Sequence, residues 1–124
     1  MTKTLSFRMV VGVNEGYGSH TANSINAEAV AEAYKEVAAE LFGATGVYVS
    51  ASMVESKTLY HTDWGCPVGG EATASFFGSA NPEFTNLNQY KEVVTALAKI
   101  LKKRFNQTTI TVEFFESEIV YLTD

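Results

Sequence analysis

Two residues of the chain, Tyr60 and Glu71, combine a titratable side chain with a position suited to ligand chemistry. Tyr60 ends a segment of alternating hydrophobic and polar residues, and Glu71 begins the next such segment after a glycine-rich loop. Each shares parity with the polar positions of its own segment, so both should face the same side of a sheet at the same end of neighbouring strands. A carboxylate there is costly to bury unless it meets a cation. Spacing alone favours a simpler interpretation, in which Glu71 is hydrated and Tyr60 is an interface aromatic.

Other reactive residues form no recognisable motif. His20, His61, Asp63, Cys66 and Glu71 lack the paired spacing of zinc sites, so we expect no metal centre. The sequence has no lysine or arginine between Lys57 and Lys91 that could lower the pKa of the Cys66 thiol, which favours a small apolar loop residue. The glycines at 65, 69 and 70 fit neither phosphate-binding fingerprint and indicate tight turns.

Length and composition limit the function classes. The 124 residues suffice for one domain, which we place at 1–124, and 46% hydrophobic residues can form a core. Nine basic against 14 acidic residues give a net charge of −5, which argues against nucleic acid as a partner. No apolar run approaches the roughly 20 residues of a membrane span. A single cysteine favours a reducing cytoplasm.

Hydrophobic periodicity divides the chain into six main elements. Strands are expected at 5–13, 47–61, 71–77 and 108–115, a short last strand at 117–122, and amphipathic helices at 26–42 and 86–105. Ser24 or Asn26 could cap the first helix, and Gly43 is the expected left-handed terminator. Residues 14–23 read as a loop.

The order of these elements predicts an α+β, ferredoxin-like split βαβ fold, βαββαβ, with an antiparallel four-stranded sheet and both helices on one face. The other face would carry five large hydrophobic residues: Val10, Tyr48, Val54, Phe77 and Phe115. Such a patch favours a closed oligomer over scattered surface hydrophobic residues, and we expect a trimer with inward-facing sheets.

The segment 46–56, GVYVSASMVES, followed by Tyr60, a ten-residue gap and Glu71, resembles the phage-encoded S-adenosylmethionine (SAM) lyases, formerly described as hydrolases. The second helix, Val112 and the terminal residues 120–122 run in a similar order. The resemblance implies a homotrimer with a PII-like fold and active sites between subunits.

The reaction implied is intramolecular and needs no cofactor. The carboxylate of SAM attacks its own γ-carbon and releases methylthioadenosine and homoserine lactone, which helps a phage escape host restriction. By the same resemblance Glu71 and Tyr60 are the catalytic residues, acting in the host cytoplasm. We also predict that Trp64 and Ser52 bind the substrate. The resemblance itself does not extend to the loops at 14–23 and 62–70 and implies no role for them.

Three other functions compete with this one. A non-catalytic PII-like trimer could bind a nucleotide or small metabolite in the same intersubunit cleft, although Arg8 and Lys57 are the only cations near it. A tautomerase would need an N-terminal proline, whereas this chain starts Met1-Thr2. Split βαβ domains also serve as binding modules.

Overall fold

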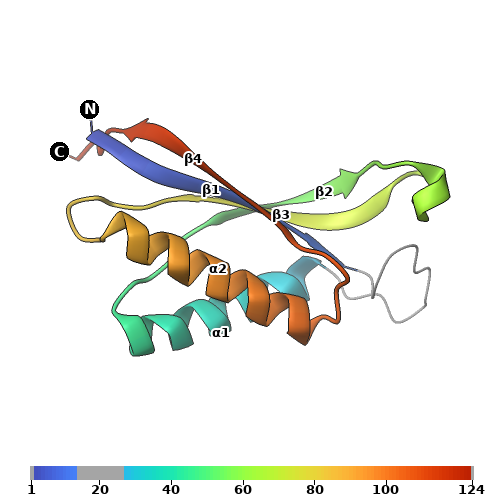
Figure 1. Ribbon diagram of the computed structural model, residues 1–124, viewed down its shortest axis with the longest axis horizontal. Coiled ribbons are helices and arrows are strands. Elements are labelled where there is room, and N and C mark those ends of the chain that lie inside the picture. The colour runs from blue at the N-terminus through green and yellow to red at the C-terminus, as the bar shows by residue number, and fades with distance from the viewer. Residues whose placement is uncertain (1, 14–26, 124) are drawn as a thin grey trace.

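The alternating segments of the sequence form one antiparallel sheet, and both helices cover the same face of it (Figure 1). The computed structural model describes residues 2–13 and 27–123. Along the chain the elements are β1 (Thr2–Gly12), α1 (Ala27–Thr45), β2 (Ser52–Thr58), a 3₁₀ turn (Thr62–Trp64), β3 (Glu71–Ser79), α2 (Leu87–Arg104) and β4 (Thr111–Ile119). The strand order is β2-β3-β1-β4. This confirms the predicted ferredoxin-like βαββαβ fold.

The core lies between the helices and the inward-facing side chains of the sheet. Phe7, Met9 and Val11 alternate along β1 and are fully buried. Tyr34 of α1 stacks on Phe76 of β3, with ring centroids 4.5 Å apart, and its hydroxyl donates a 3.0 Å hydrogen bond to the carbonyl oxygen of Val49. Burial raises the pKa of Tyr34 well above its ordinary value.

Tyr90 of α2 is also buried, close to Phe7, and burial raises its pKa too. Unlike that of Tyr34, its hydroxyl has no hydrogen-bond partner among the described residues. The Tyr90 hydroxyl therefore loses its hydrogen bonds to water on folding and gains none from the described residues.

The first helix ends later than predicted. Gly43 lies within α1, with nothing within 4 Å of the place a Cβ would take. The left-handed residue is Gly46, with φ of 78°, and its N–H donates to the carbonyl of Phe42 at 2.8 Å. Gly43 as terminator is therefore wrong. The predicted caps Ser24 and Asn26 and the loop at 14–23 lie outside the described residues.

The second strand begins at Ser52 instead of residue 47. Val47 and Val49 are buried as the alternation predicts, but the segment 47–51 runs beside the sheet without joining its ladder. Tyr48 packs edge-on against Phe42, with ring centroids 5.9 Å apart. Tyr48 therefore lies beside the end of α1, and its prediction as an open-face residue is wrong.

The last strand is continuous. β4 runs from Thr111 to Ile119, so the separate short strand expected at 117–122 does not form. Among residues 2–13 and 27–123, neither helix combines the length and apolar character needed to cross a bilayer.

The face of the sheet opposite the helices remains open in the single chain (Figure 1). Val54, Phe77 and Phe115 stand exposed on it, and Arg8 forms a 3.0 Å ion pair with Glu113 between them. This open face, defined by the side chains that share the parity of Arg8, also carries the candidate site.

Candidate functional site

The β2–β3 hairpin brings Tyr60 and Glu71 together. In the strand register Thr58 lies opposite Glu71, so the chain leaves β2 and returns to β3 at the same level. Tyr60, two residues beyond Thr58, turns back over this end. Its hydroxyl donates a 2.9 Å hydrogen bond to Oε1 of Glu71. The predicted pair therefore forms at the predicted place on the open face.

The connection between the two strands is a shaped loop. The 3₁₀ turn begins at His61, whose Nδ1 accepts from the N–H of Asp63 at 3.1 Å, and it ends at Gly65 with φ of 97°. Gly70, with φ of 93°, stands where a Cβ would collide with the side chain of Leu59. Both glycines permit backbone that an L side chain disfavours, and this confirms the turn role predicted for them.

Glu71 is nearly buried although it is charged. Only 9% of it is exposed. While Oε1 accepts from Tyr60, Oε2 lies over Gly12 of β1, 2.9 Å from the place of a Cβ on that glycine. The side-chain oxygen of Gln107 lies against the same point. A carboxylate oxygen and an amide oxygen thus converge above Gly12.

Gln107 is positioned by the end of the second helix. Its N–H donates to the carbonyl of Lys102 at 2.9 Å, and its Nε2 donates to the carbonyl of Phe105 at 3.2 Å. Asn106 takes a left-handed φ of 51°, which turns the chain from α2 toward β4. The Nε2 contact turns the amide so that its oxygen, an acceptor, points to Gly12.

A pocket of about 420 Å³ opens beside Tyr60 and Glu71, within the size range of small-molecule sites. Its wall combines residues from β1, the hairpin and the start of β4: Val10, Gly12, Thr58, Tyr60, Trp64, Glu71, Thr73, Thr109 and Thr111. Of these described residues, Glu71 alone carries a charge. The pocket can therefore offer a cation one carboxylate, together with aromatic and hydroxyl surface.

Hydroxyl groups fix one side of the pocket. Thr58 donates to Thr73 at 3.2 Å, Thr73 bonds to Ser56 at 2.7 Å, and Ser56 bonds to Ser75 at 2.8 Å. These bonds link β2 to β3 across the open face. They hold the pocket wall in register without adding charge.

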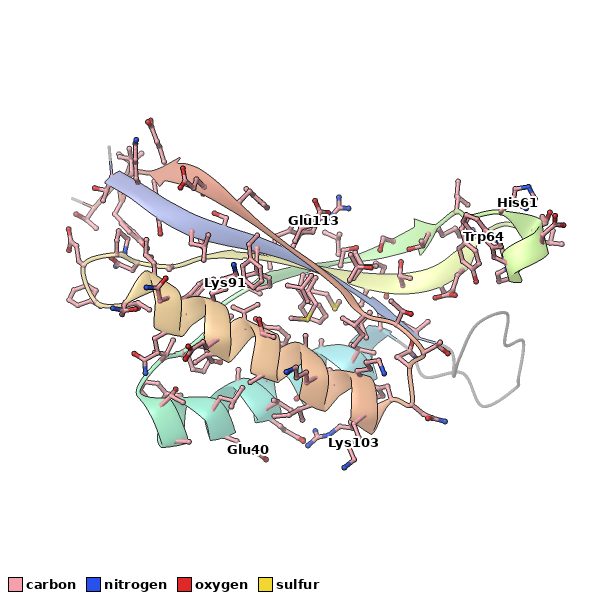
Figure 2. All side chains as sticks on the ribbon, in the orientation of Figure 1. Glu40, His61, Trp64, Lys91, Lys103 and Glu113 are labelled. Atoms are coloured by element: carbon pink, nitrogen blue, oxygen red, sulfur yellow. The ribbon has the colours of Figure 1, made fainter. Side chains whose placement is uncertain are left out.

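The two predicted substrate-binding residues, Trp64 and Ser52, lie in different places relative to the pocket. Trp64 lines the pocket and is 72% exposed, next to the ring of His61 at the tip of the hairpin (Figure 2). Ser52 lies at the other end of β2, opposite Phe77, and does not line the pocket. The structure brings Tyr60, Glu71 and Trp64 together and leaves Ser52 apart.

Gly12 and Gln107 were missed from the sequence. Gly12 shares the parity of Arg8 and Val10, which is a signal for the open face. Gln107 follows a helix by three residues and offers no comparable signal. The threonines 109 and 111 have the parity of the open face and could have been named.

Of the remaining candidates, His61 contacts Asp63, with Nδ1 3.6 Å from Oδ2, and His20 lies outside the described residues. No group of three or more His, Cys, Asp or Glu side chains suited to a metal occurs within the described ranges. The Cys66 thiol lies 3.5 Å from the carbonyl oxygen of Pro67. Nothing in this geometry makes it a nucleophile.

A family model described as SAM lyase matches residues 2–123. The chain belongs to the SAM lyase family. It is therefore an enzyme that acts on S-adenosylmethionine and cleaves it. This confirms the resemblance carried by the 46–71 segment.

Two solved structures share the fold of this family member. A phage SAM lyase in the apo state is 21% identical, with a TM-score of 0.65, over 92% of this chain and 81% of that chain. A phage SAM lyase in complex with S-methyl-5'-thioadenosine is 22% identical, with a TM-score of 0.63, over 91% of this chain and 81% of that chain. No curated protein matches the chain significantly.

Proposed function

We propose that the enzyme cleaves SAM by intramolecular attack of the substrate carboxylate on its γ-carbon. The carboxylate oxygen forms a bond to this carbon while the carbon–sulfur bond breaks and its electron pair stays on sulfur. The products are neutral S-methyl-5'-thioadenosine and homoserine lactone. This proposal rests on one observation about the pocket. Among its described lining residues Glu71 is the charged one, and Tyr60 donates a hydrogen bond to it.

Glu71 is the proposed partner of the substrate ammonium group. A nearly buried carboxylate gains most from an ion pair with a ligand that excludes water. Fixing the ammonium orients the attached carboxylate toward the γ-carbon, and such orientation can lower a barrier by several kcal/mol.

Tyr60 and Trp64 are the proposed partners of the sulfonium and the adenine. Both are aromatic and line the same pocket. A sulfonium over an aromatic face gains roughly 0.5–2 kcal/mol by a cation–π contact. Attack of a carboxylate on a sulfonium neutralises both charges, so a site with little water favours the reaction. The leaving group is neutral and needs no general acid.

The product found in a relative supports this reaction. S-methyl-5'-thioadenosine, bound in one of the structurally similar phage lyases, is the leaving group of the proposed step. A nucleotide sensor, the competing function, would need cations for phosphates. The described lining of the pocket contains none.

We also propose a homotrimer in which the open faces meet. Val54, Phe77 and Phe115 form an exposed apolar patch on that face, and a pocket on the same face would then lie at a subunit boundary. The proposed setting is the cytoplasm of a host cell during phage infection, where loss of SAM would disable SAM-dependent restriction. In a strain with such a restriction system, the wild-type gene should raise plating of a sensitive phage, and the Glu71→Gln gene should not.

Isotope labelling of the product tests the reaction. SAM is incubated with the enzyme in ¹⁸O-water, and products are followed by mass spectrometry. Intramolecular attack gives unlabelled homoserine lactone first, and later homoserine labelled only in its carboxyl group. Direct attack by water would label the γ-hydroxyl instead and would exclude the proposed step.

A further inference from the structure

We infer that the pocket selects ligands by positive charge and leaves the substrate carboxylate without an ionic partner. Consequently, SAM that lacks its carboxylate should bind without reacting and inhibit the enzyme. This inference rests on the proposed function, because it uses the carboxylate as the nucleophile. It names a class of ligand: sulfonium amines that carry no carboxylate.

Among its described lining residues, the pocket has one negatively charged side chain and no positively charged one. Glu71 is the charged residue of the described lining. SAM carries an ammonium, a sulfonium and a carboxylate. Two of these three groups suit the site, while the third, an anion, meets no cation among the described lining residues, which besides Glu71 are hydroxyl, aromatic and apolar.

Within one subunit, no lysine or arginine is placed to bind that carboxylate. The segment 14–26 contains neither residue type. On the open face Arg8 is engaged with Glu113 at 3.0 Å. Lys57 lies opposite Ala72 in the register, on the helix side of the sheet. The other seven lie at Lys3 near the far end of β1 and on the two helices: Lys35, Lys91, Lys99, Lys102, Lys103 and Arg104.

This arrangement suits a reaction in which the carboxylate is the nucleophile. An ion pair with lysine or arginine would lower the energy of the carboxylate in the ground state and would be lost as its charge disappears in the transition state. A carboxylate held only by its attachment to the ammonium-bearing carbon avoids that loss. Glu71 orients the substrate, and a lining without a described lysine or arginine leaves its carboxylate reactive. Both features therefore favour attack of the carboxylate on the γ-carbon.

Two unreactive analogues of SAM each lack one of its charged groups, the carboxylate or the sulfonium. Decarboxylated SAM keeps the ammonium and sulfonium, so its net charge rises from +1 to +2 as the anion disappears. S-adenosylhomocysteine keeps the ammonium and carboxylate but has a neutral sulfur, so its net charge is zero. Neither analogue can undergo the proposed step, because the first lacks the nucleophile and the second lacks the sulfonium leaving group.

Calorimetry of the wild-type protein with each analogue gives affinities without turnover. We expect decarboxylated SAM to bind at least about tenfold more tightly than S-adenosylhomocysteine, the equivalent of roughly 1.4 kcal/mol. In assays with SAM it should inhibit competitively, with an inhibition constant no higher than the KM of SAM. Mass spectrometry should recover it intact.

Variants test whether the preference for positively charged ligands comes from Glu71 or from the overall charge of the protein. Glu71→Gln should abolish most of the preference for the dication, whereas Glu40→Gln, on the exposed surface of α1, should keep it. Arg8→Gln should leave the ratio of the two affinities unchanged.

Equal or reversed affinities, or a preference retained in Glu71→Gln, would overturn the inference. So would cleavage of decarboxylated SAM, or an Arg8→Gln variant whose affinity for S-adenosylhomocysteine alone is weakened. Failure of the proposed function has a different signature, since SAM itself would then yield no lactone while both binding measurements could still be made.

Discussion

The side-chain oxygen of Gln107 occupies the space above the Cα of Gly12, where any other residue would place its Cβ. Oε2 of Glu71 lies 2.9 Å from the same point. The strand residue, the carboxylate and the amide therefore depend on one another, although they come from β1, β3 and the segment after α2. A glycine is required here for close approach, since its φ is not in the left-handed region.

Gly12→Ala should disable the enzyme while leaving it folded. The added methyl group must displace Gln107 and Glu71, and a displacement of about 1 Å at a site can cost about 10²-fold in rate. The cost in stability should be about 1–3 kcal/mol, typical of overpacking. Release of S-methyl-5'-thioadenosine and urea denaturation measure the two effects.

Gly43→Ala is the matched control. Gly43 lies within α1 with nothing within 4 Å of its missing Cβ. Alanine should stabilise the protein by about 0.5–1 kcal/mol and leave the rate of SAM cleavage unchanged. If both alanine variants retained full activity, the contact above Gly12 would have no role in the site.

Glu71→Gln should lower kcat/KM for SAM by about 10²-fold, because the ion pair with the ammonium becomes a hydrogen bond from the ammonium to a neutral amide. Tyr60→Phe removes the 2.9 Å hydrogen bond to Glu71 but keeps the aromatic ring, so a smaller loss of about tenfold is expected. Steady-state kinetics with purified proteins measures both. Circular dichroism should show unchanged folding, and wild-type kinetics in Glu71→Gln would contradict the assignment.

Tyr90→Phe and Tyr34→Phe should change stability in different directions. The buried hydroxyl of Tyr90 has no described partner, so its removal should be neutral or stabilise the protein by up to about 1 kcal/mol. The hydroxyl of Tyr34 bonds to the buried Val49, and its loss should cost about 1–3 kcal/mol. Chemical denaturation measures the difference, and equal losses would show that the Tyr90 hydroxyl is satisfied in solution.

Alkaline pH should unfold the protein through these same tyrosines. Burial raises the pKa of each above the ordinary value of 10.0, so above pH 10 the unfolded chain loses protons that the folded chain retains. Stability is complete below pH 10 and falls above it by about 1.4 kcal/mol per pH unit for each tyrosine. Denaturation curves at pH 9 and 11 test this, and Tyr90→Phe should show a shallower fall.

Phe115→Asp should weaken self-association. Phe115 is exposed on the open face of the single chain, where a charge costs nothing until another copy covers it. Light scattering should show a trimer for the wild type and smaller species for the variant. Phe84→Asp, a change at another exposed phenylalanine outside that face, should keep the trimer, and identical masses for all three proteins would argue against association through the open face.

The fold was predictable because its signals are local. Alternation in β1 and β3 and the apolar stripes of the helices each lie within a few residues, and their order determines the split βαβ topology. The end of α1 was not predictable in this way, because Gly43 and Gly46 are both acceptable helix terminators from sequence alone. Alternation at Val47 and Val49 correctly indicated burial but not pairing, since Tyr34 takes the carbonyl of Val49 from outside the sheet.

The site was predictable only in part for a related reason. A period of two identifies the face of a strand, so Tyr60 and Glu71 could be placed on one side of the sheet. It does not identify the position along the strand, and Ser52 therefore appeared equivalent to residues that lie at the other end of β2. Gln107 reaches Gly12 from 95 positions away in the chain, a contact for which no local pattern exists.

The hairpin between β2 and β3 contributes Thr58, Tyr60, Trp64, Glu71 and Thr73, five of the nine described residues around the pocket. None of the described side chains between 59 and 70 belongs to the buried core, and the hairpin projects past the ends of both helices (Figure 1). The outer wall of the pocket therefore lies outside the buried core, while its floor belongs to the sheet. Changes of length or sequence between residues 59 and 70 should therefore reshape the outer wall of the pocket without disturbing the core, whereas Glu71 stays tied to Gly12 of β1.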